Sequence, residues 1–390
     1  MFWLSQAVNT TPAHNHPTEA PAPLALFLVA PPGLEAVLAA EASALGIAGT
    51  NAVPGGVEAT GTWATVRLAN VQLRCCDRVL LRLTDFPAAH LAQLDKRVRA
   101  YHWDALLTAG TPVRVEASCK ASRIYHTGAV TGRITAAIRA QLGADNDGQA
   151  PVRVLARIER NRCTLSLDTS GEPLHKRGSK LAIGKAPLRE TLAAAMLHQC
   201  GFDGHEPVLD PLCGSGTLVL EAAAIAAGHA AGTARGFAFE QLADHDAAAW
   251  ADERATNTAI ANRPVVPSFL GYDRDAGAID GARANAARAG LEGWTQFATQ
   301  PISALQRPDG PAGLVILNPP YGDRIGDKAG LRGLYATLGR VLRAHFQGWR
   351  VGLITSDATL ARQTKLPFLA PSAPVPHGGL RIKLWRTEAL

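Results

Sequence analysis

Short apolar runs, turns and two helical patterns make up the first part of the chain, residues 24–171. The run LALFLVA is followed by a Pro-Pro-Gly turn and then by apolar residues at helical spacing, Leu34, Val37, Leu38 and Leu45. Further apolar or alternating runs predict strands at 64–69, 78–86, 112–119, 152–161 and 162–171. A longer pattern predicts a helix at 129–143. This mixture predicts an α+β region.

The second half alternates regularly between apolar strands and Ala-rich helices. A turn-rich basic segment, residues 171–187, leads into a predicted helix at 188–201. Strands are predicted at 207–212, 268–273, 295–300, 314–319 and 350–357. Helices between successive strands are typical of a doubly wound, mostly parallel sheet. The last runs, 365–371 and 379–386, predict an antiparallel pair that closes the sheet.

Composition and the chain's opening narrow the class of protein. Residues 1–23 are rich in Pro, Ala and Thr without periodicity, so we expect a disordered tail. No apolar run is long enough to span a bilayer, and no export signal opens the chain. Six cysteines lack CxxC spacing, which favours reduced thiols over a zinc site. We therefore expect a cytoplasmic protein with no membrane span and no metal.

The positive charge is concentrated in the first half. Residues 24–185 hold 20 Lys+Arg against 13 Asp+Glu, an excess that accounts for the whole net charge of +6. A basic module beside a neutral one favours a polyanion-binding part joined to a part with another task. Chance could produce an excess of this size, so the charge needs support from motifs.

The first strand of the alternating half ends in LDPLCGSGT. Gly214 and Gly216 allow a tight turn close to a ligand, just before a predicted helix N-terminus. The third glycine of a dinucleotide fingerprint would fall at Val219, and the P-loop lysine is absent. Asp210 opens the loop, and its carboxylate suits the ammonium and sulfonium of S-adenosylmethionine better than a pyrophosphate. An ordinary strand-to-helix turn is the alternative.

The second strand ends in GYDRD. An aspartate at the carboxyl end of such a strand can accept both hydroxyl groups of a ribose, and Asp273 is in that position. Asp275 is predicted to cap the helix that follows.

The fourth strand ends in NPPY, at the same edge of the predicted sheet. Pro319 and Pro320 have no N–H, so this corner offers carbonyl oxygens, and Asn318 adds a side-chain carbonyl. Such acceptors suit an –NH2 group whose lone pair is delocalised into a ring, because gripping its hydrogens out of plane favours the attacking geometry. Tyr321 offers a face for a planar base.

These motifs, in this order, resemble those of class I adenosylmethionine-dependent amino-methyltransferases. The junction LHKRGSKLAIGKAPLRETLAAA resembles that of the THUMP-domain RNA guanine-N2-methyltransferases, and most of all the family that methylates 23S ribosomal RNA. The resemblance implies a ferredoxin-like segment at 24–75, a THUMP RNA-binding domain at 76–172 and a Rossmann-like methyltransferase domain at 173–390.

The resemblance also implies residue roles. Asn318 to Tyr321 match the catalytic corner, and Pro187 matches the segment that closes over the methionine end of the cofactor. Where the family has an aspartate for the adenine amino group, this chain has Pro301, and Gln300 is the substitute we expect. The other expected contacts to S-adenosylmethionine are Asp210, Pro211, Cys213, Gly214, Gly216, Asp273 and Arg274.

Basic residues of the first half and the junction are candidates for RNA phosphate contacts. They are Lys120, Arg123 and His126 in one turn, and Lys176 and Arg177 in the junction. For each, a solvated charge or a packing role is the alternative. The function expected is methyl transfer to guanine N2, with 23S rRNA favoured and tRNA possible. DNA adenine, a protein glutamine, or a catalytically decayed RNA-binding factor remain alternatives.

Overall fold

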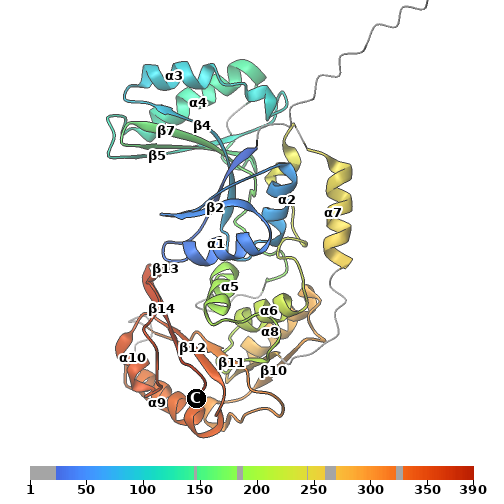
Figure 1. Cartoon of the computed structure of the whole chain (residues 1–390), viewed down its shortest axis with the longest axis vertical. Helices are drawn as coiled ribbons and strands as arrows, with labels where there is room; N and C mark the ends of the chain where they lie inside the picture. Colours follow the sequence, from blue (N-terminus) through green and yellow to red (C-terminus); the bar gives the residue numbers. More distant parts are fainter. Residues whose placement is uncertain (1–22, 145–146, 182–187, 244, 260–268, 322–327) are drawn as a thin grey trace, which may run out of the picture.

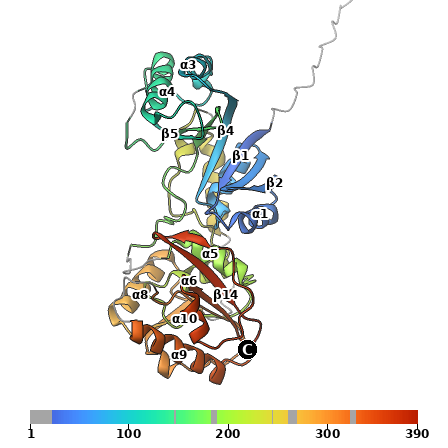
Figure 2. The same cartoon turned by 90° about the vertical axis from the view of Figure 1, so that its left-hand side faces the viewer.

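The computed structural model describes residues 23–144, 147–181, 188–243, 245–259, 269–321 and 328–390. The predicted disordered tail therefore lies, except for its last residue, outside the described part, as does Pro187. Two bodies follow one another along the long axis of the molecule, each built on a seven-stranded sheet (Figures 1 and 2).

The first sheet runs through the whole α+β region in the order β2-β3-β1-β4-β7-β6-β5. Its elements are β1 (Leu24–Val29), α1 (Glu35–Ala44), β2 (Ala48–Val53), β3 (Gly56–Gly61), α2 (Trp63–Gln72), β4 (Arg78–Pro87), α3 (Leu91–Arg99), β5 (Arg114–Lys120), α4 (Thr127–Leu142), β6 (Arg153–Glu159) and β7 (Arg162–Asp168). The long strand β4 pairs with β1 on one side and β7 on the other, so it joins the two parts of this sheet.

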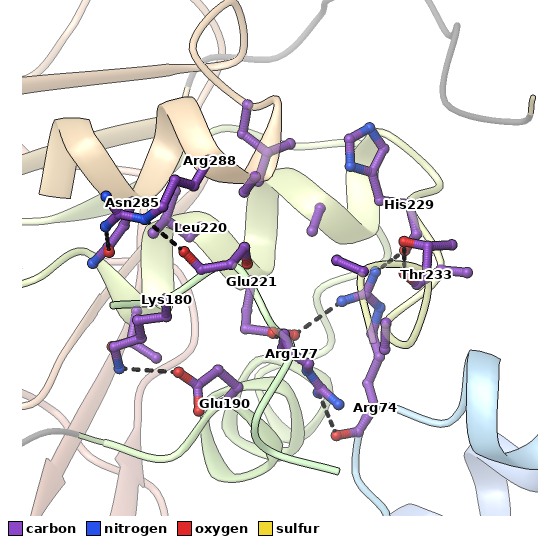
Figure 3. A pocket seen from close by; sticks show the side chains of 18 residues that line it. Arg74, Arg177, Lys180, Glu190, Leu220, Glu221, His229, Thr233, Asn285 and Arg288 are labelled. Carbon is purple, nitrogen blue, oxygen red and sulfur yellow. Dashed lines mark hydrogen bonds and ion pairs between the residues drawn. The ribbon is translucent and has the colours of Figure 1, made fainter. Parts of the chain in front are cut away.

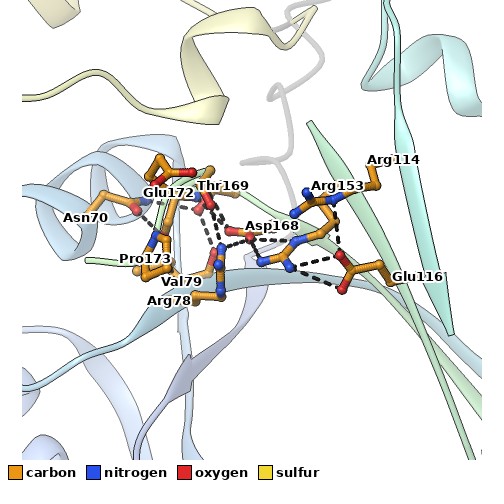
Figure 4. Close-up of polar contacts among 12 residues, drawn as sticks. Asn70, Arg78, Val79, Arg114, Glu116, Arg153, Asp168, Thr169, Glu172 and Pro173 are labelled. Carbon is orange, nitrogen blue, oxygen red and sulfur yellow. Dashed lines mark hydrogen bonds and ion pairs between the residues drawn. The ribbon is translucent and has the colours of Figure 1, made fainter. Parts of the chain in front are cut away.

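A buried carboxylate holds that junction together (Figure 4). Asp168 is fully buried, and its Oδ2 accepts a hydrogen bond from Arg153 Nη2 at 2.7 Å and one from Arg78. Arg153 also pairs with Glu116 at 3.1 Å, across from β6 to β5. Each buried charge thus has an opposite partner, which burial of a charge requires.

The strand predicted at residues 64–69 is wrong, because this segment forms part of α2. Thr62 and Thr65 form a reciprocal capping box at its start. Val66, Ala69 and Asn70 are buried at helical spacing, and the Asn70 amide donates to Thr169 Oγ1 at 2.9 Å. Tertiary burial of one face therefore decided between two patterns that a short apolar run cannot distinguish.

The second sheet has the order β10-β9-β8-β11-β12-β14-β13. Its elements are α5 (Glu190–Gln199), β8 (Val208–Asp210), α6 (Thr217–Ala226), α7 (Ala247–Ala259), β9 (Phe269–Asp273), α8 (Ala276–Ala289), β10 (Thr295–Thr299), β11 (Leu314–Leu317), α9 (Lys328–His345), β12 (Arg350–Thr355), α10 (Ala358–Gln363), β13 (Val375–His377) and β14 (Leu380–Arg386). The strands β8 to β12 are parallel and β14 is antiparallel, as predicted.

Its closing hairpin differs from the predicted one. Residues 365–371 form no strand, and β13 is the antiparallel partner of β14. Two prolines, Pro367 and Pro371, lack the N–H that a ladder needs, which explains why this apolar run is not a strand.

Neighbouring residues on the central strands point to opposite faces of the second sheet. Val208 packs with α5, α6 and α8, whereas Leu209 packs with α9 and α10. Strand order reverses between β8 and β11, so a crevice is expected at their carboxyl ends.

The segment after α6 returns to the first body, where α7 lies beside it (Figure 1). Arg67 of α2 forms a two-pronged ion pair with Glu253 of α7, with both N–O distances 2.8 Å. Phe239 donates its backbone N–H to Thr169 at 3.0 Å and packs on Trp250. These contacts therefore hold the two bodies together in addition to the covalent connection between them.

None of the described helices has the length and apolar character to span a membrane, and all six cysteines are free thiols.

Candidate active site at the sheet rim

The carboxyl ends of β8, β9 and β11 bring three predicted motifs together. Asp210 ends β8, and only 2% of it is exposed. Its Oδ1 accepts the backbone N–H of Leu212 at 3.0 Å. Burial raises the pKa of Asp210 to about 8, and the nearby carboxylate of Asp273 acts in the same direction. A cation placed here would relieve both effects.

Two glycines shape the loop after β8. Both have positive φ, +52° at Gly214 and +82° at Gly216, which other residues rarely adopt. A Cβ at Gly216 would lie 3.0 Å from the Phe297 ring, so this glycine permits close packing against β10. A Cβ at Gly214 would meet nothing within 4 Å, so this residue faces open space where a ligand can approach.

Asp273 connects the second strand to that loop. Its Oδ2 accepts the Gly214 N–H and its Oδ1 accepts the Asp275 N–H, both at 3.0 Å. Because a carboxylate oxygen has two lone pairs, both oxygens can still accept from a ligand. Asp275 caps α8 through the N–H groups of Gly277 and Ala278, which confirms the predicted cap.

The corner after β11 holds a buried acceptor for which the described residues provide no partner. Asn318 Oδ1 is inaccessible to solvent and makes no hydrogen bond among the described residues. The Pro320 carbonyl, in contrast, accepts from the Tyr335 hydroxyl at 3.2 Å. The Tyr321 ring is half-buried and packs against both clusters of buried apolar side chains, the one that contains Val208 and the one that contains Leu209. Burial raises the pKa of its hydroxyl group to about 12. An unsatisfied buried oxygen is costly unless a ligand supplies a donor.

The rim suits a cationic nucleoside better than a phosphate. The two side chains at the ends of β8 and β9, Asp210 and Asp273, are both acidic, and both act on the Cys213 thiol of the glycine loop. Gln300 donates its amide N–H to the Ala304 carbonyl at 2.9 Å, which orients the side chain that we expect to meet adenine. Two carboxyl groups and an amide oxygen can accept from the ammonium, hydroxyl and amino groups of S-adenosylmethionine, and Gly214 leaves open space for its approach.

Comparison with known proteins agrees with this geometry. Residues 177–367 match a family model described as RMKL-like, methyltransferase domain, and residues 25–80 match an RlmL ferredoxin-like domain. Residues 177–367 belong to the RMKL-like methyltransferase family. This chain is 37% identical over 358 residues to the ribosomal RNA large subunit methyltransferase K/L of Syntrophotalea carbinolica, covering 87% of this chain and 50% of that protein. It thus spans about half the length of the curated relatives it matches.

Two solved structures resemble the whole described chain. SMU.472, a methyltransferase crystallised with SAH, has a TM-score of 0.86 and 26% identity, covering 94% of this chain and 98% of that one. A predicted N6-adenine-specific DNA methylase from Listeria monocytogenes has a TM-score of 0.85 and 29% identity, covering 94% and 97%. The two-body arrangement is therefore shared with methyltransferases.

The other residues expected at the cofactor site differ in how far they are buried. Pro211 follows β8 in the buried stretch, and Arg274 is exposed beside Asp273. Cys213 is buried, and a Cβ on Gly271 would come within 3.1 Å of its sulfur, so Cys213 has a packing role at least. Burial raises the pKa of its thiol, which makes it a poor nucleophile.

The predicted RNA contacts divide into exposed and buried groups. Lys120, Arg123 and His126 are exposed between β5 and α4, and Lys176 is exposed and pairs with Glu172. The role predicted for Arg177 is wrong. Its side chain is only 8% exposed and its guanidinium donates to Glu221 and to two backbone carbonyls, so it is too deeply buried to meet a phosphate at the surface.

Arg177 instead belongs to an ion triad between the bodies (Figure 3). Glu221 of α6 pairs with Arg177 at 3.2 Å and with Arg74, which precedes β4, at 3.0 Å. Burial acts to raise the pKa of Glu221, but the two guanidinium groups outweigh it and the pKa is lowered. The triad lines a cavity of about 120 Å³. The sequence signal missed was an acidic residue inside the apolar run TLVLEAAAIA.

Lys180 lies nearer the cofactor loop. Its ammonium donates to Thr217 Oγ1 at 2.8 Å and pairs with Glu190 at 3.1 Å. Thr217 is the first residue of α6, directly after Gly216. The junction is therefore fixed on α6 at two points one turn apart, Thr217 and Glu221.

A group of potential metal ligands lies away from the rim. Ligand atoms of Glu41, Cys75 and His198 are within 4.8 Å of one another. Both carboxylate oxygens of Glu41, however, accept backbone N–H groups, from Arg74 at 2.7 Å and Cys75 at 3.0 Å. These two hydrogen bonds make Glu41 a cap on the turn before β4, a structural role that explains its carboxylate without a metal.

Proposed function

We propose that this protein transfers a methyl group from S-adenosylmethionine to the exocyclic N2 of a guanine in 23S ribosomal RNA. One observation carries the proposal: the buried Oδ1 of Asn318, which has no hydrogen-bond partner among the described residues, lies at the end of β11, at the same rim as Asp210 and the glycine loop. The printed name of the relatives, ribosomal RNA large subunit methyltransferase K/L, supports the substrate class.

Several rim residues bind and orient the cofactor in this proposal. Asp273 accepts the ribose hydroxyls with the lone pairs that its backbone contacts leave free. Gly214 leaves open space in which the cofactor can approach the backbone closely. Asp210 faces the ammonium and sulfonium groups of the cofactor. The Gln300 amide oxygen accepts from the adenine amino group in place of the missing aspartate. When bound, the cofactor supplies an electrophilic methyl group.

The NPPY corner positions the acceptor amine. Asn318 Oδ1 and the Pro319 carbonyl each accept one hydrogen of the guanine amino group, which turns its lone pair out of the ring plane. Tyr321 supports the base by stacking. A strong general base is unnecessary, because the nitrogen carries a positive charge once it is methylated and then loses its proton to solvent.

The first body is the RNA-binding part in this proposal. Its excess of Lys and Arg is complementary to phosphate, and the exposed residues Lys120, Arg123, His126 and Lys176 are the expected contacts. We assign residues 76–172 to a THUMP domain on the resemblance above. Ribosomal RNA as substrate also favours a cytoplasmic location.

Transfer of tritiated methyl groups tests the function directly. The purified chain is incubated with labelled cofactor and with rRNA lacking the modification, tRNA, DNA or total protein. We expect label in 23S rRNA, recovered as N2-methylguanosine by mass spectrometry. Label in tRNA alone would change the substrate but retain the chemistry. Label in DNA as N6-methyladenine, the activity named for the Listeria protein, would refute the proposed substrate.

A further inference from the structure

Two turns of the first body are clipped together at one end of its sheet. The turn after β5 and the hairpin between β6 and β7 are joined by three hydrogen bonds. Arg160 donates its backbone N–H to the Lys120 carbonyl at 3.3 Å, and Asn161 donates to Ser122 Oγ at 3.0 Å. The Asn161 side chain accepts the Arg123 N–H at 2.8 Å.

The clipped turns concentrate unusual backbone geometry. Of the four non-glycine residues with positive φ in the described chain, three are here: Ala121, Arg160 and Asn161. Arg160 and Asn161 form the two-residue turn between β6 and β7, a hairpin geometry that requires positive φ at both positions, and the hydrogen bonds above hold Ala121 against that turn. The clip therefore fixes the segment that follows it.

An exposed aromatic pair follows the clip. Tyr125 is 72% exposed, the highest value among the large apolar side chains of the described residues, although Ile124 beside it is buried. Its ring lies 4.2 Å from that of His126, centroid to centroid, at an angle of 40°. A tyrosine kept in water against a second ring, on a fixed turn, offers a flat face to a partner.

Charge around this pair is positive. Glu159 is the acidic group of β6 at this end, and it faces Lys120 at 3.7 Å, Arg157 at 2.5 Å and Arg160. One carboxylate cannot neutralise three cations, and the exposed Arg123 adds a fourth. The surface is therefore complementary to a polyanion.

We propose that the rings of Tyr125 and His126 form a stacking platform for an unpaired base of the RNA substrate, with the surrounding cations holding the flanking phosphates. This proposal rests on the proposed function. Aromatic faces and cations together are the chemistry of single-stranded nucleic-acid binding. A base inside a duplex has both faces covered, so only an unpaired base can use the platform.

The platform belongs to the first body, whereas the proposed catalytic rim belongs to the second. The elements β5 and α4 that flank it lie at the opposite end from α9, β12 and the second sheet (Figure 1). An RNA that reaches both places must present an unpaired nucleotide at one end and the target guanine at the other. Substrate choice would then depend on the distance between these two features.

Binding of a short, unstructured, fluorescein-labelled RNA to the full chain tests the platform. The same strand in a perfect duplex serves as the comparison, and affinity is measured by fluorescence anisotropy. We expect Tyr125→Ala to weaken single-strand binding on the order of tenfold or more, whereas Tyr125→Phe retains it and duplex binding changes little. Leu369→Ala, which removes an exposed apolar side chain elsewhere, is the matched control.

Three results would overturn the platform. These are wild-type affinity in Tyr125→Ala, an equal loss for the single strand and the duplex, or an equal loss in the Leu369→Ala control. Failure of the proposed function looks different: the wild-type chain would label no RNA, whatever the oligonucleotide affinities. In an active enzyme, Tyr125→Ala should raise KM for rRNA and leave both kcat and cofactor affinity unchanged.

Discussion

The backbone N–H of Gly214 donates to Oδ2 of Asp273 at 3.0 Å, which joins the loop after β8 to the end of β9. The loop is thus held in shape by a neighbouring strand before any ligand arrives. The same carboxylate that fixes the loop is the proposed ribose acceptor, so loop geometry and cofactor recognition depend on one residue. Preorganisation of this kind reduces the entropy lost on binding.

The two loop glycines should respond differently to alanine. Gly214→Ala places its methyl group in open space, so we expect cofactor binding to weaken at least tenfold. Unfolding free energy should fall by only about 1 kcal/mol, the cost of a strained positive φ. Gly216→Ala adds a contact 3.0 Å from the Phe297 ring, so its loss of stability should be larger. Calorimetric titration and thermal unfolding measure the two effects. Equal stability losses would contradict the assignment of Gly214 to the ligand side.

Asn318→Ala should remove catalysis and retain cofactor binding. The buried Oδ1 has no structural partner among the described residues, so little stability depends on it. By analogy with the removal of one oriented catalytic dipole, kcat should fall by roughly 10²–10³. Tyr335→Phe is the control, because its hydroxyl bonds the Pro320 carbonyl and leaves Asn318 untouched. An equal loss of cofactor affinity in Asn318→Ala would contradict the role of Asn318 in positioning the acceptor amine.

Cofactor affinity should rise with pH. With a pKa of about 8, Asp210 is mostly protonated at pH 7 in the unliganded protein, whereas a bound cation favours its ionised form. Binding then releases a proton, and affinity should increase up to about tenfold per pH unit until it levels off above pH 8. Titration calorimetry in buffers of different ionisation enthalpy detects the proton. In Asp210→Asn the pH dependence should vanish; its persistence would assign it to another group.

The raised pKa of Asp210 should make the unliganded protein less stable as pH rises, whereas it makes cofactor affinity rise with pH. Because the folded pKa of Asp210 is raised, the unfolded chain carries fewer protons than the folded one between about pH 4 and 8. The contribution of this group to stability therefore falls as pH rises through that window. We expect Asp210→Asn to raise Tm at pH 8 and to change it little at pH 4. A lower Tm at pH 8 would show that the carboxylate stabilises the fold.

The ion triad should be essential for stability, whereas the neighbouring exposed pair should not. Glu221→Gln leaves Arg74 and Arg177 buried without a counter-charge, which typically costs about 3–5 kcal/mol. Lys176→Gln removes an exposed i,i+4 pair with Glu172, which contributes at most about 1 kcal/mol. Chemical denaturation of both variants measures the difference. Similar small losses would mean that the triad does not hold the two bodies together.

The sequence predicted the second sheet well because its signals are local. Apolar runs of strand length, each followed by glycine, proline or aspartate, mark strands and their carboxyl ends without knowledge of their neighbours. It failed at 64–69, where a short apolar run fits either a strand or one face of a helix. It also failed at 365–371, which forms no strand although the Leu369 N–H donates to the Arg386 carbonyl of β14, the predicted partner, at 2.8 Å.

The sequence by itself determined which residue types end each strand, and so the chemistry available at the rim. Only the tertiary structure decided which charges are exposed and which are buried. Lys176 and Arg177 are neighbours in the same basic run, yet one is exposed and the other is buried against Glu221. Pairing depends on residues far apart in the chain, since Arg74, Arg177 and Glu221 meet only when the two bodies pack. The physical reason is that burial and counter-charge are properties of position in space, which local sequence does not encode.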